Sequence, residues 1–95
     1  MAANKMQFGL AVRGQYPSGD DIRFRFEEMM EQVRLIEALG WDSVTKTSHY
    51  TTHPWQSFQQ LPILARLSAE TTRLRLNAGI LLLSLHKPLD IAEQL

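Results

Sequence analysis

The sequence contains no cysteine. This absence excludes disulfide frameworks and thiolate metal sites, and it fits a reducing compartment such as the cytoplasm. There is also no excess of charge, because ten Lys and Arg residues balance ten Asp and Glu residues. Proteins that bind nucleic acid or anionic membranes through charge usually carry a basic excess. We therefore expect neither partner, and we expect a cytoplasmic protein.

Long apolar runs are missing as well. No window reaches the roughly 18 apolar residues of a membrane span, and the first fifteen residues lack the pattern of a signal peptide. The chain shows no low-complexity segment. Its 95 residues, of which 44% are hydrophobic, have the size of a small single domain with a modest core. These features predict a soluble globular chain.

The first part of the chain carries the pattern of a strand followed by a helix. Large side chains at every second position predict a strand over residues 6–12, and Gly and Pro mark residues 13–20 as a loop. Apolar residues then recur at spacings of three and four, which predicts an amphipathic helix. Asp20 or Asp21 can cap its start, and Gly40 suits its end. The apolar stripe of this helix consists of Ile22, Phe26, Met29, Val33 and Ile36.

Residues 41–47 follow this helix after almost no linker, which favours a second strand parallel to the first. Ser57 and Gln60 have the spacing of a capping box at the start of a second helix. Pro62 conflicts with that start, because proline removes a backbone hydrogen bond. We therefore expect the regular helix to run from Pro62 to about Glu70. The residues expected to point inward are Ile63, Leu64 and Leu67.

Residues 74–85 are dense in apolar side chains, as in a strand that is buried on both faces of a parallel sheet. Pro88 suits the first position of a last helix over residues 89–95. The predicted order is βαβαβα with parallel strands. Three such strands leave the sheet edges and the helix layer incomplete, whereas a (β/α)8 TIM barrel needs about 250 residues. We interpret residues 1–95 as an incomplete single domain, the N-terminal portion of such a barrel. The alternative is a small three-stranded domain that closes by oligomerising.

Functional groups in parallel α/β folds gather beyond the carboxyl ends of the strands. His49 is the main candidate, because it follows the second strand and imidazole exchanges protons near neutral pH. A loop or packing histidine is the alternative. His53 lies four residues later, a metal-ligand spacing on a helix, but the intervening threonines and Pro54 argue against a helix there. No acidic residue lies between Lys46 and Ala69, so we predict no metal site.

Other polar and aromatic positions carry weaker signals. His86 and Lys87 could contact a phosphate or lie in a solvated loop. Trp55 and Phe58 could line a flat ligand, but local packing is the favoured interpretation. The glycine spacing does not match a dinucleotide-binding fingerprint. Gly79 interrupts an aliphatic run, which indicates either a close approach of backbone to a ligand or crowding against a helix.

Several segments together resemble the bacterial luciferase-like, flavin-dependent monooxygenase family. They are ALGWDSV, the SHY after the second strand, and RLRLNAGILLLSLHKPLDIAEQL. The resemblance implies a barrel that binds reduced FMN at its C-terminal face, or a deazaflavin coenzyme in sister groups. Family members oxygenate a small organic substrate with dioxygen, or transfer a hydride in the deazaflavin branch. The resemblance further implies that a flavin reductase supplies reduced flavin and that the full-length protein is a homo-oligomer.

The resemblance also assigns roles to individual residues. His49 is similar to the family's histidine that acts in proton transfer, although Ser48 stands where the family often has an acidic residue. Gly79 and Ile80 are similar to a strand bulge, commonly with a non-prolyl cis peptide, that supports the flavin ring. Asn77 and Ala78 are expected beside it as further cofactor-binding residues.

The phosphate-binding segments of this fold come late in the barrel, so we expect residues 1–95 alone to bind flavin weakly or not at all. A non-catalytic flavin-binding or structural barrel relative is the alternative function. A hydrolytic barrel enzyme would need acidic groups or metal ligands at its strand ends, and the sequence has few there.

Overall fold

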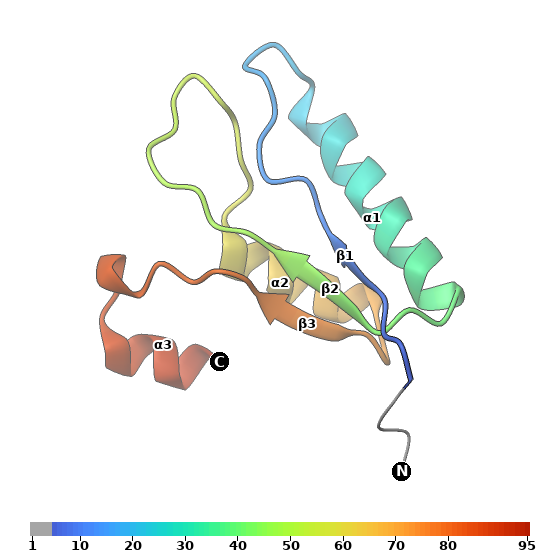
Figure 1. Ribbon diagram of the computed structural model, residues 1–95. Helices are drawn as coiled ribbons and strands as arrows, with labels where there is room; N and C mark the ends of the chain where they lie inside the picture. Colours follow the sequence, from blue (N-terminus) through green and yellow to red (C-terminus); the bar gives the residue numbers. More distant parts are fainter. Residues whose placement is uncertain (1–4) are drawn as a thin grey trace.

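Strands and helices alternate along the chain in the predicted βαβαβα order, in a computed structural model that describes residues 5–95 (Figure 1). The first four residues of the predicted domain lie outside the described part. The strands are β1 (Gly9–Ala11), β2 (Ser43–Lys46) and β3 (Arg75–Ala78). The helices are α1 (Ile22–Ala38), α2 (Gln60–Glu70) and α3 (Pro88–Gln94), with a short 3-10 helix at Leu83–Leu85.

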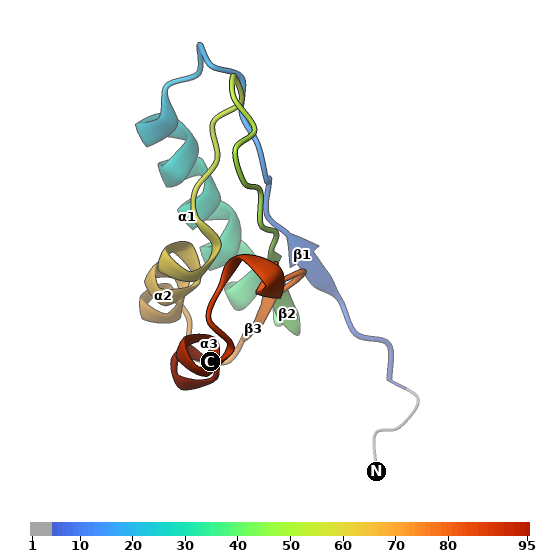
Figure 2. The same ribbon diagram turned by 90° about the vertical axis from the view of Figure 1, so that its left-hand side faces the viewer.

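The three strands form one parallel sheet in the order β1-β2-β3, as predicted. Leu10 of β1 pairs with Val44 of β2, which pairs in turn with Leu76 of β3. Helices α1 and α2 cover one face of the sheet, and no helix covers the other face in the described part of the chain (Figures 1 and 2). The parallel arrangement places all three carboxyl ends at one edge.

The core lies between the sheet and helices α1 and α2. The predicted inward positions of α2 are all buried, whereas the stripe of α1 is shifted: Met30 is buried, and Ile22 and Phe26 are only partly so. The buried core consists of Val12, Met29, Met30, Val33, Ile36, Val44, Ile63, Leu64, Leu67 and Leu74. Among residues 5–95, no helix combines the length and apolar character that a bilayer span requires.

Helix α1 begins and ends as the sequence predicts. Asp21 is the N-cap, and its Oδ1 accepts hydrogen bonds from the backbone N–H groups of Arg23 (3.0 Å) and Phe24 (3.4 Å). These bonds satisfy donors that have no acceptor within the helix. After the helix, Gly40 adopts a φ of 82°, in the left-handed region that glycine enters without steric cost.

The start of α2 differs from the prediction. The helix begins at Gln60 instead of Pro62, and its N-cap Gln59 makes no side-chain cap hydrogen bond. Pro62 fits inside the first turn because N–H groups there have no helical acceptor. The predicted capping box between Ser57 and Gln60 is therefore wrong. The side chain of Gln60 is instead buried and bonded elsewhere.

The third strand is much shorter than the predicted range 74–85. It ends at Ala78, and the chain then passes through a cis peptide at Gly79–Ile80 into the 3-10 helix. The strand is not buried on both faces, because Arg75 and Asn77 are exposed. A run of apolar residues indicates burial but not backbone conformation. It therefore could not distinguish the strand from the apolar loop that follows. The first two strands are also shorter than predicted, although single backbone bonds, such as those from Val12 N–H to the Thr45 carbonyl and from Asp42 N–H to the Phe8 carbonyl, continue the ladder beyond their ends.

Candidate functional site

The carboxyl ends of the strands bring the predicted site residues to one edge of the sheet (Figure 1). Lys46 ends β2 and pairs with Ala78, which ends β3. The backbone N–H of Gly79 extends this pairing by donating to the carbonyl of Lys46 (3.1 Å). His49 follows the end of β2, and Gly79 follows that of β3. The two candidates therefore leave the sheet at neighbouring positions.

His49 is half-buried and lies against the loop that follows β1. Its Nε2 is 3.4 Å from the hydroxyl of Thr47. A Cβ atom at Gly14 would lie 2.6 Å from that Nε2 and 2.7 Å from the Thr47 hydroxyl. Real Cβ contacts are not this short, so the ring occupies space that any larger residue at position 14 would take. The backbone of Gly14 thus forms one side of the histidine site.

The Gly79–Ile80 peptide is cis, as the resemblance implied. A Cβ atom at Gly79 would lie 3.0 Å from Thr45 Cγ2 and 3.2 Å from Asn77 Nδ2. The close neighbours of Gly79 are therefore sheet residues, and crowding against a helix is not the reason for the glycine. Asn77 donates through Nδ2 to the Thr45 hydroxyl (3.2 Å). The side chain of Ile80 is 77% exposed, so it offers apolar surface.

Two threonines that no sequence motif marks connect these groups. Thr45 contacts Asn77 and fills the space that a side chain at Gly79 would need, whereas Thr47 contacts His49. They are two residues apart, with Thr45 on β2 and Thr47 directly after its end, so the period-2 alternation of the strand places both side chains on the same side. Val44, which precedes Thr45, and Lys46, which lies between the two threonines, are buried on the opposite side, toward the helices. The threonines therefore belong to the sheet face that no helix covers.

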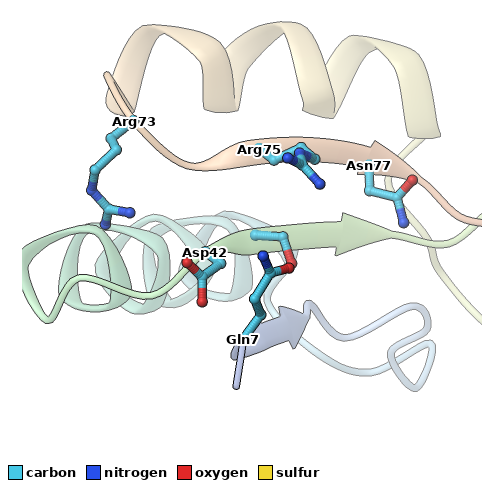
Figure 3. A pocket seen from close by; sticks show the side chains of 6 residues that line it. Gln7, Asp42, Arg73, Arg75 and Asn77 are labelled. Carbon is cyan, nitrogen blue, oxygen red and sulfur yellow. The ribbon is translucent and has the colours of Figure 1, made fainter. Parts of the chain in front are cut away.

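The same face carries a hollow of about 460 Å³ (Figure 3). Figure 3 shows Arg75 and Asn77 side by side on β3, with Asp42 and Gln7 opposite them. Asp42 is held in place because its Oδ2 accepts the Phe8 N–H (2.9 Å). The lining residues are Gln7, Asp42, Ser43, Arg73, Arg75 and Asn77. The hollow is polar, and Asn77 connects it with the candidate site at the carboxyl edge.

Two buried polar side chains lie behind the site, on the helix side of the sheet. Lys46 is completely buried, and this burial lowers the pKa of its amine. Its Nζ donates to the carbonyl of Thr47 (2.9 Å). Gln60, which is 5% exposed, donates from Nε2 to the carbonyls of Lys46 (2.8 Å) and Ile80 (3.1 Å). The Ser57–Gln60 spacing was the only signal at Gln60, and it predicted a different role.

The loops after β1 and β2 extend beyond the sheet side by side (Figures 1 and 2). Tyr16 and Gln56 exchange both backbone hydrogen bonds, each 2.8 Å long, in an antiparallel bridge. Burial raises the pKa of Tyr16, and the Arg13 guanidinium lies 5.1 Å from the centre of its ring. Nε2 of Gln56 also lies within hydrogen-bond distance of the carbonyls of Pro17, Ser18 and Asp20. Backbone and side-chain hydrogen bonds thus connect the two loops to each other.

The remaining candidates lie apart from this arrangement. His53 and His86 are exposed, and the segment with His49 and His53 is a loop, as predicted. Phe58 packs edge-on against Tyr16 at 5.8 Å, which confirms local packing for that residue. Trp55 is 51% exposed, so its packing is partial, and the choice between packing and lining a flat ligand stays a prediction. Among residues 5–95, no three His, Asp or Glu side chains converge as metal ligands.

Comparison with known proteins gives consistent matches. The profile of the family described as "Luciferase-like monooxygenase" matches residues 6–95. Luciferase-like monooxygenases of Escherichia coli strains K12 and O6:H1 are each 30% identical over 94 residues, which is 99% of this chain. This chain spans only 28% of their length.

Solved structures share the fold. The crystal structure of apo-MsnO8 superposes with a TM-score of 0.77 at 24% identity, over 95% of this chain and 27% of that one. Monooxygenase RslO1 from Streptomyces bottropensis gives a TM-score of 0.76 at 27% identity, over 94% of this chain and 28% of that one. These shares agree with the interpretation of the fold as a portion of a larger barrel.

Proposed function

The chain belongs to the luciferase-like monooxygenase family, and we propose that it supplies part of the flavin site of a flavin-dependent monooxygenase. One observation carries the proposal: His49 and the Gly79–Ile80 peptide follow adjacent parallel strand ends, joined by the bond from Gly79 N–H to the Lys46 carbonyl. A group able to transfer protons and a glycine-containing backbone segment thus lie at the edge where ligands bind in this class of fold.

The residues fit reduced FMN. Gly79 presents backbone without a side chain next to Thr45 and Asn77, Asn77 offers an amide beside it, and the exposed Ile80 side chain can cover apolar ring surface. Reduced flavin supplies the electrons with which dioxygen oxygenates the organic substrate. In this proposal His49 holds or moves a proton at Nε2, next to the Thr47 hydroxyl. The flavin phosphate binds outside this chain, and a flavin reductase supplies the reduced cofactor to a homo-oligomeric full-length protein.

The first test is a flavin titration of the 95-residue chain and of a version extended to the barrel length of its relatives. Fluorescence quenching follows oxidised FMN, and anaerobic titration follows the reduced form. We expect binding by the extended protein only. A deazaflavin coenzyme is titrated in parallel, because sister groups of the family use one, and a hydride-transfer role would show as a preference for the deazaflavin over FMN. If neither cofactor binds the extended protein, the proposed function fails.

The second test is His49→Gln in the extended protein. Loss of a proton-transfer group should lower the oxygenation rate by about a hundredfold or more while FMN binding is retained. His53→Gln is the matched control, because His53 is exposed and lies in the same loop. Equal rates in the His49 variant and the parent would remove the catalytic role. Flavin binding without oxygenation by the parent protein would favour the non-catalytic alternative.

A further inference from the structure

The side chain of Gln60 connects two segments of the proposed flavin site. Gln60 is the first residue of α2 and is 5% exposed. Its amide nitrogen lies 2.8 Å from the carbonyl oxygen of Lys46 and 3.1 Å from that of Ile80. A carboxamide nitrogen carries two hydrogens, so both are used. One acceptor ends β2, and the other is the carbonyl of Ile80, directly after the Gly79–Ile80 peptide that follows β3.

The Lys46 acceptor leads to His49 through short contacts. The Lys46 carbonyl also accepts the Gly79 N–H at 3.1 Å, and the Nζ of Lys46 donates to the Thr47 carbonyl at 2.9 Å. The Thr47 hydroxyl in turn lies 3.4 Å from His49 Nε2. The Ile80 acceptor needs no intermediary, because it is part of the segment expected to support the flavin ring.

The presence of an amide at this buried position needs an explanation. Burying a carboxamide costs free energy unless its polar atoms are bonded, and an apolar side chain would fill the same space without that cost. Gln60 does not cap its helix, since Gln59 occupies the N-cap position. Helix α2 covers the face opposite Thr45 and Asn77, so Gln60 acts through the backbone. Its two bonds are the specific gain from the amide.

We propose that Gln60 is a positioning residue that fixes the His49 segment relative to the Gly79–Ile80 peptide. The effect of Gln60 on flavin binding rests on the proposed function. The joining of the two backbone segments is independent of any ligand. The two parts of the proposal can therefore be measured separately.

The test uses Gln60→Met in the extended protein, because methionine has a similar length and shape but cannot donate. Hydrogen exchange of the flavin-free protein is measured over segments 47–50 and 79–82. We expect faster exchange in both segments, an FMN affinity about tenfold lower, and a changed visible circular dichroism of the bound flavin at saturation. Gln59→Met is the matched control, since Gln59 is exposed and its side chain makes no cap bond. It should leave all three quantities unchanged.

Gln60→Asn keeps the amide but shortens the side chain, so it should protect only one of the two segments. If the methionine variant does not fold, the exchange rates of Gln60→Asn test the positioning role. Unchanged exchange, or faster exchange that is not confined to the two segments, would overturn the positioning role whether or not flavin binds. If the parent protein binds no flavin but both segments exchange faster in Gln60→Met, the joining role stands and the proposed function alone fails.

Discussion

At the scale of single residues, glycine positions determine where the reactive groups can lie. The His49 ring occupies the space that a side chain at Gly14 would need, and Gly79 approaches Thr45 and Asn77 in the same way. At Gly14 the nearest atoms are the polar Nε2 and Oγ1 groups proposed to handle the proton. A methyl group there would act directly on the site and not on the core.

We predict that Gly14→Ala displaces the His49 ring. The added Cβ would lie 2.6 Å from Nε2, and the histidine side chain is the part that can move. The oxygenation rate of the extended protein should fall by about tenfold to a hundredfold, because small displacements of a reacting group are costly. The ring position is checked by the His49 imidazole resonances in an NMR spectrum.

Gly19→Ala is the matched control in the same loop, because no atom lies within 4 Å of a Cβ at that position. It should change neither the resonances nor the rate. An unshifted His49 resonance in Gly14→Ala would contradict the steric argument.

The position of a candidate residue could be predicted from sequence where its side chain is reactive and it lies shortly after the end of a strand. His49 met both conditions, and the structure places it at the carboxyl edge; its catalytic role stays a prediction. Thr45, Thr47 and Gln60 did not meet them. Thr45 and Gln60 contact residues distant in sequence, such as Asn77 and Ile80, and neither periodicity nor local spacing contains such contacts. Thr47 contacts His49 two residues away, but no sequence motif marks it.

At the scale of elements, carboxylates position the turn between α2 and β3. Glu37 of α1 accepts hydrogen bonds from the N–H groups of Thr72, Arg73 and Leu74 and from the Thr72 hydroxyl. Desolvation opposes ionisation of this carboxyl, but the hydrogen bonds outweigh it and lower its pKa. These contacts place the start of β3 relative to α1, and thereby Asn77 and Gly79 relative to the rest of the sheet.

Glu70 at the end of α2 makes the stability depend on pH. Hydrogen bonds from Arg34 of α1 and from Arg66 lower its pKa from 4.5 to about 2. Because the pKa is lower in the folded state, the stabilisation is complete above 4.5 and is lost as the pH falls toward 2. The free energy of unfolding should therefore decrease with falling pH across this window.

We predict that Glu70→Gln makes this decrease shallower, because the amide does not titrate. Denaturant unfolding of the extended protein at a series of pH values measures the slope. Glu93→Gln, on the exposed side of α3, is the control and should keep the slope of the parent protein. Parallel slopes for Glu70→Gln and the parent would show that the Arg34 and Arg66 contacts contribute nothing.

The order and direction of the elements could be predicted because the helices carry a 3.6-residue pattern and the next strand follows α1 and α2 after a short linker. The ends of β3 could not. Its apolar run continues through residues 81–85, which the structure places in a loop and a 3-10 helix. The start of α2 could not be predicted for a different reason. Proline often marks a helix boundary, but the first turn of a helix tolerates it, and Pro62 lies in that turn.

At the scale of the whole molecule, the fold has one covered and one uncovered sheet face (Figure 2). Large apolar side chains are exposed at several places, and the outer edges of β1 and β3 have no partner strand in the described part of the chain. Exposed apolar surface and open edges favour association. The most exposed of these apolar residues are Met6, Phe24, Leu39, Ile80, Leu89 and Leu95.

We predict that the 95-residue chain alone binds the dye ANS and self-associates as its concentration rises. The version extended to barrel length should do both to a much smaller extent, because further strands would pair with the edges and cover the open face. ANS fluorescence and sedimentation velocity measure the two properties. Equal dye binding and association by both versions would contradict this explanation of the open face.

The bridge between Tyr16 and Gln56 restricts how the loops can change in evolution or by design. Each residue holds the other's backbone, and the Gln56 side chain reaches three carbonyls of the opposite loop. An insertion or deletion in one loop would move its half of this pattern out of register. Changes of length in the two loops are therefore coupled, so a redesign of this part of the molecule has to alter both loops together.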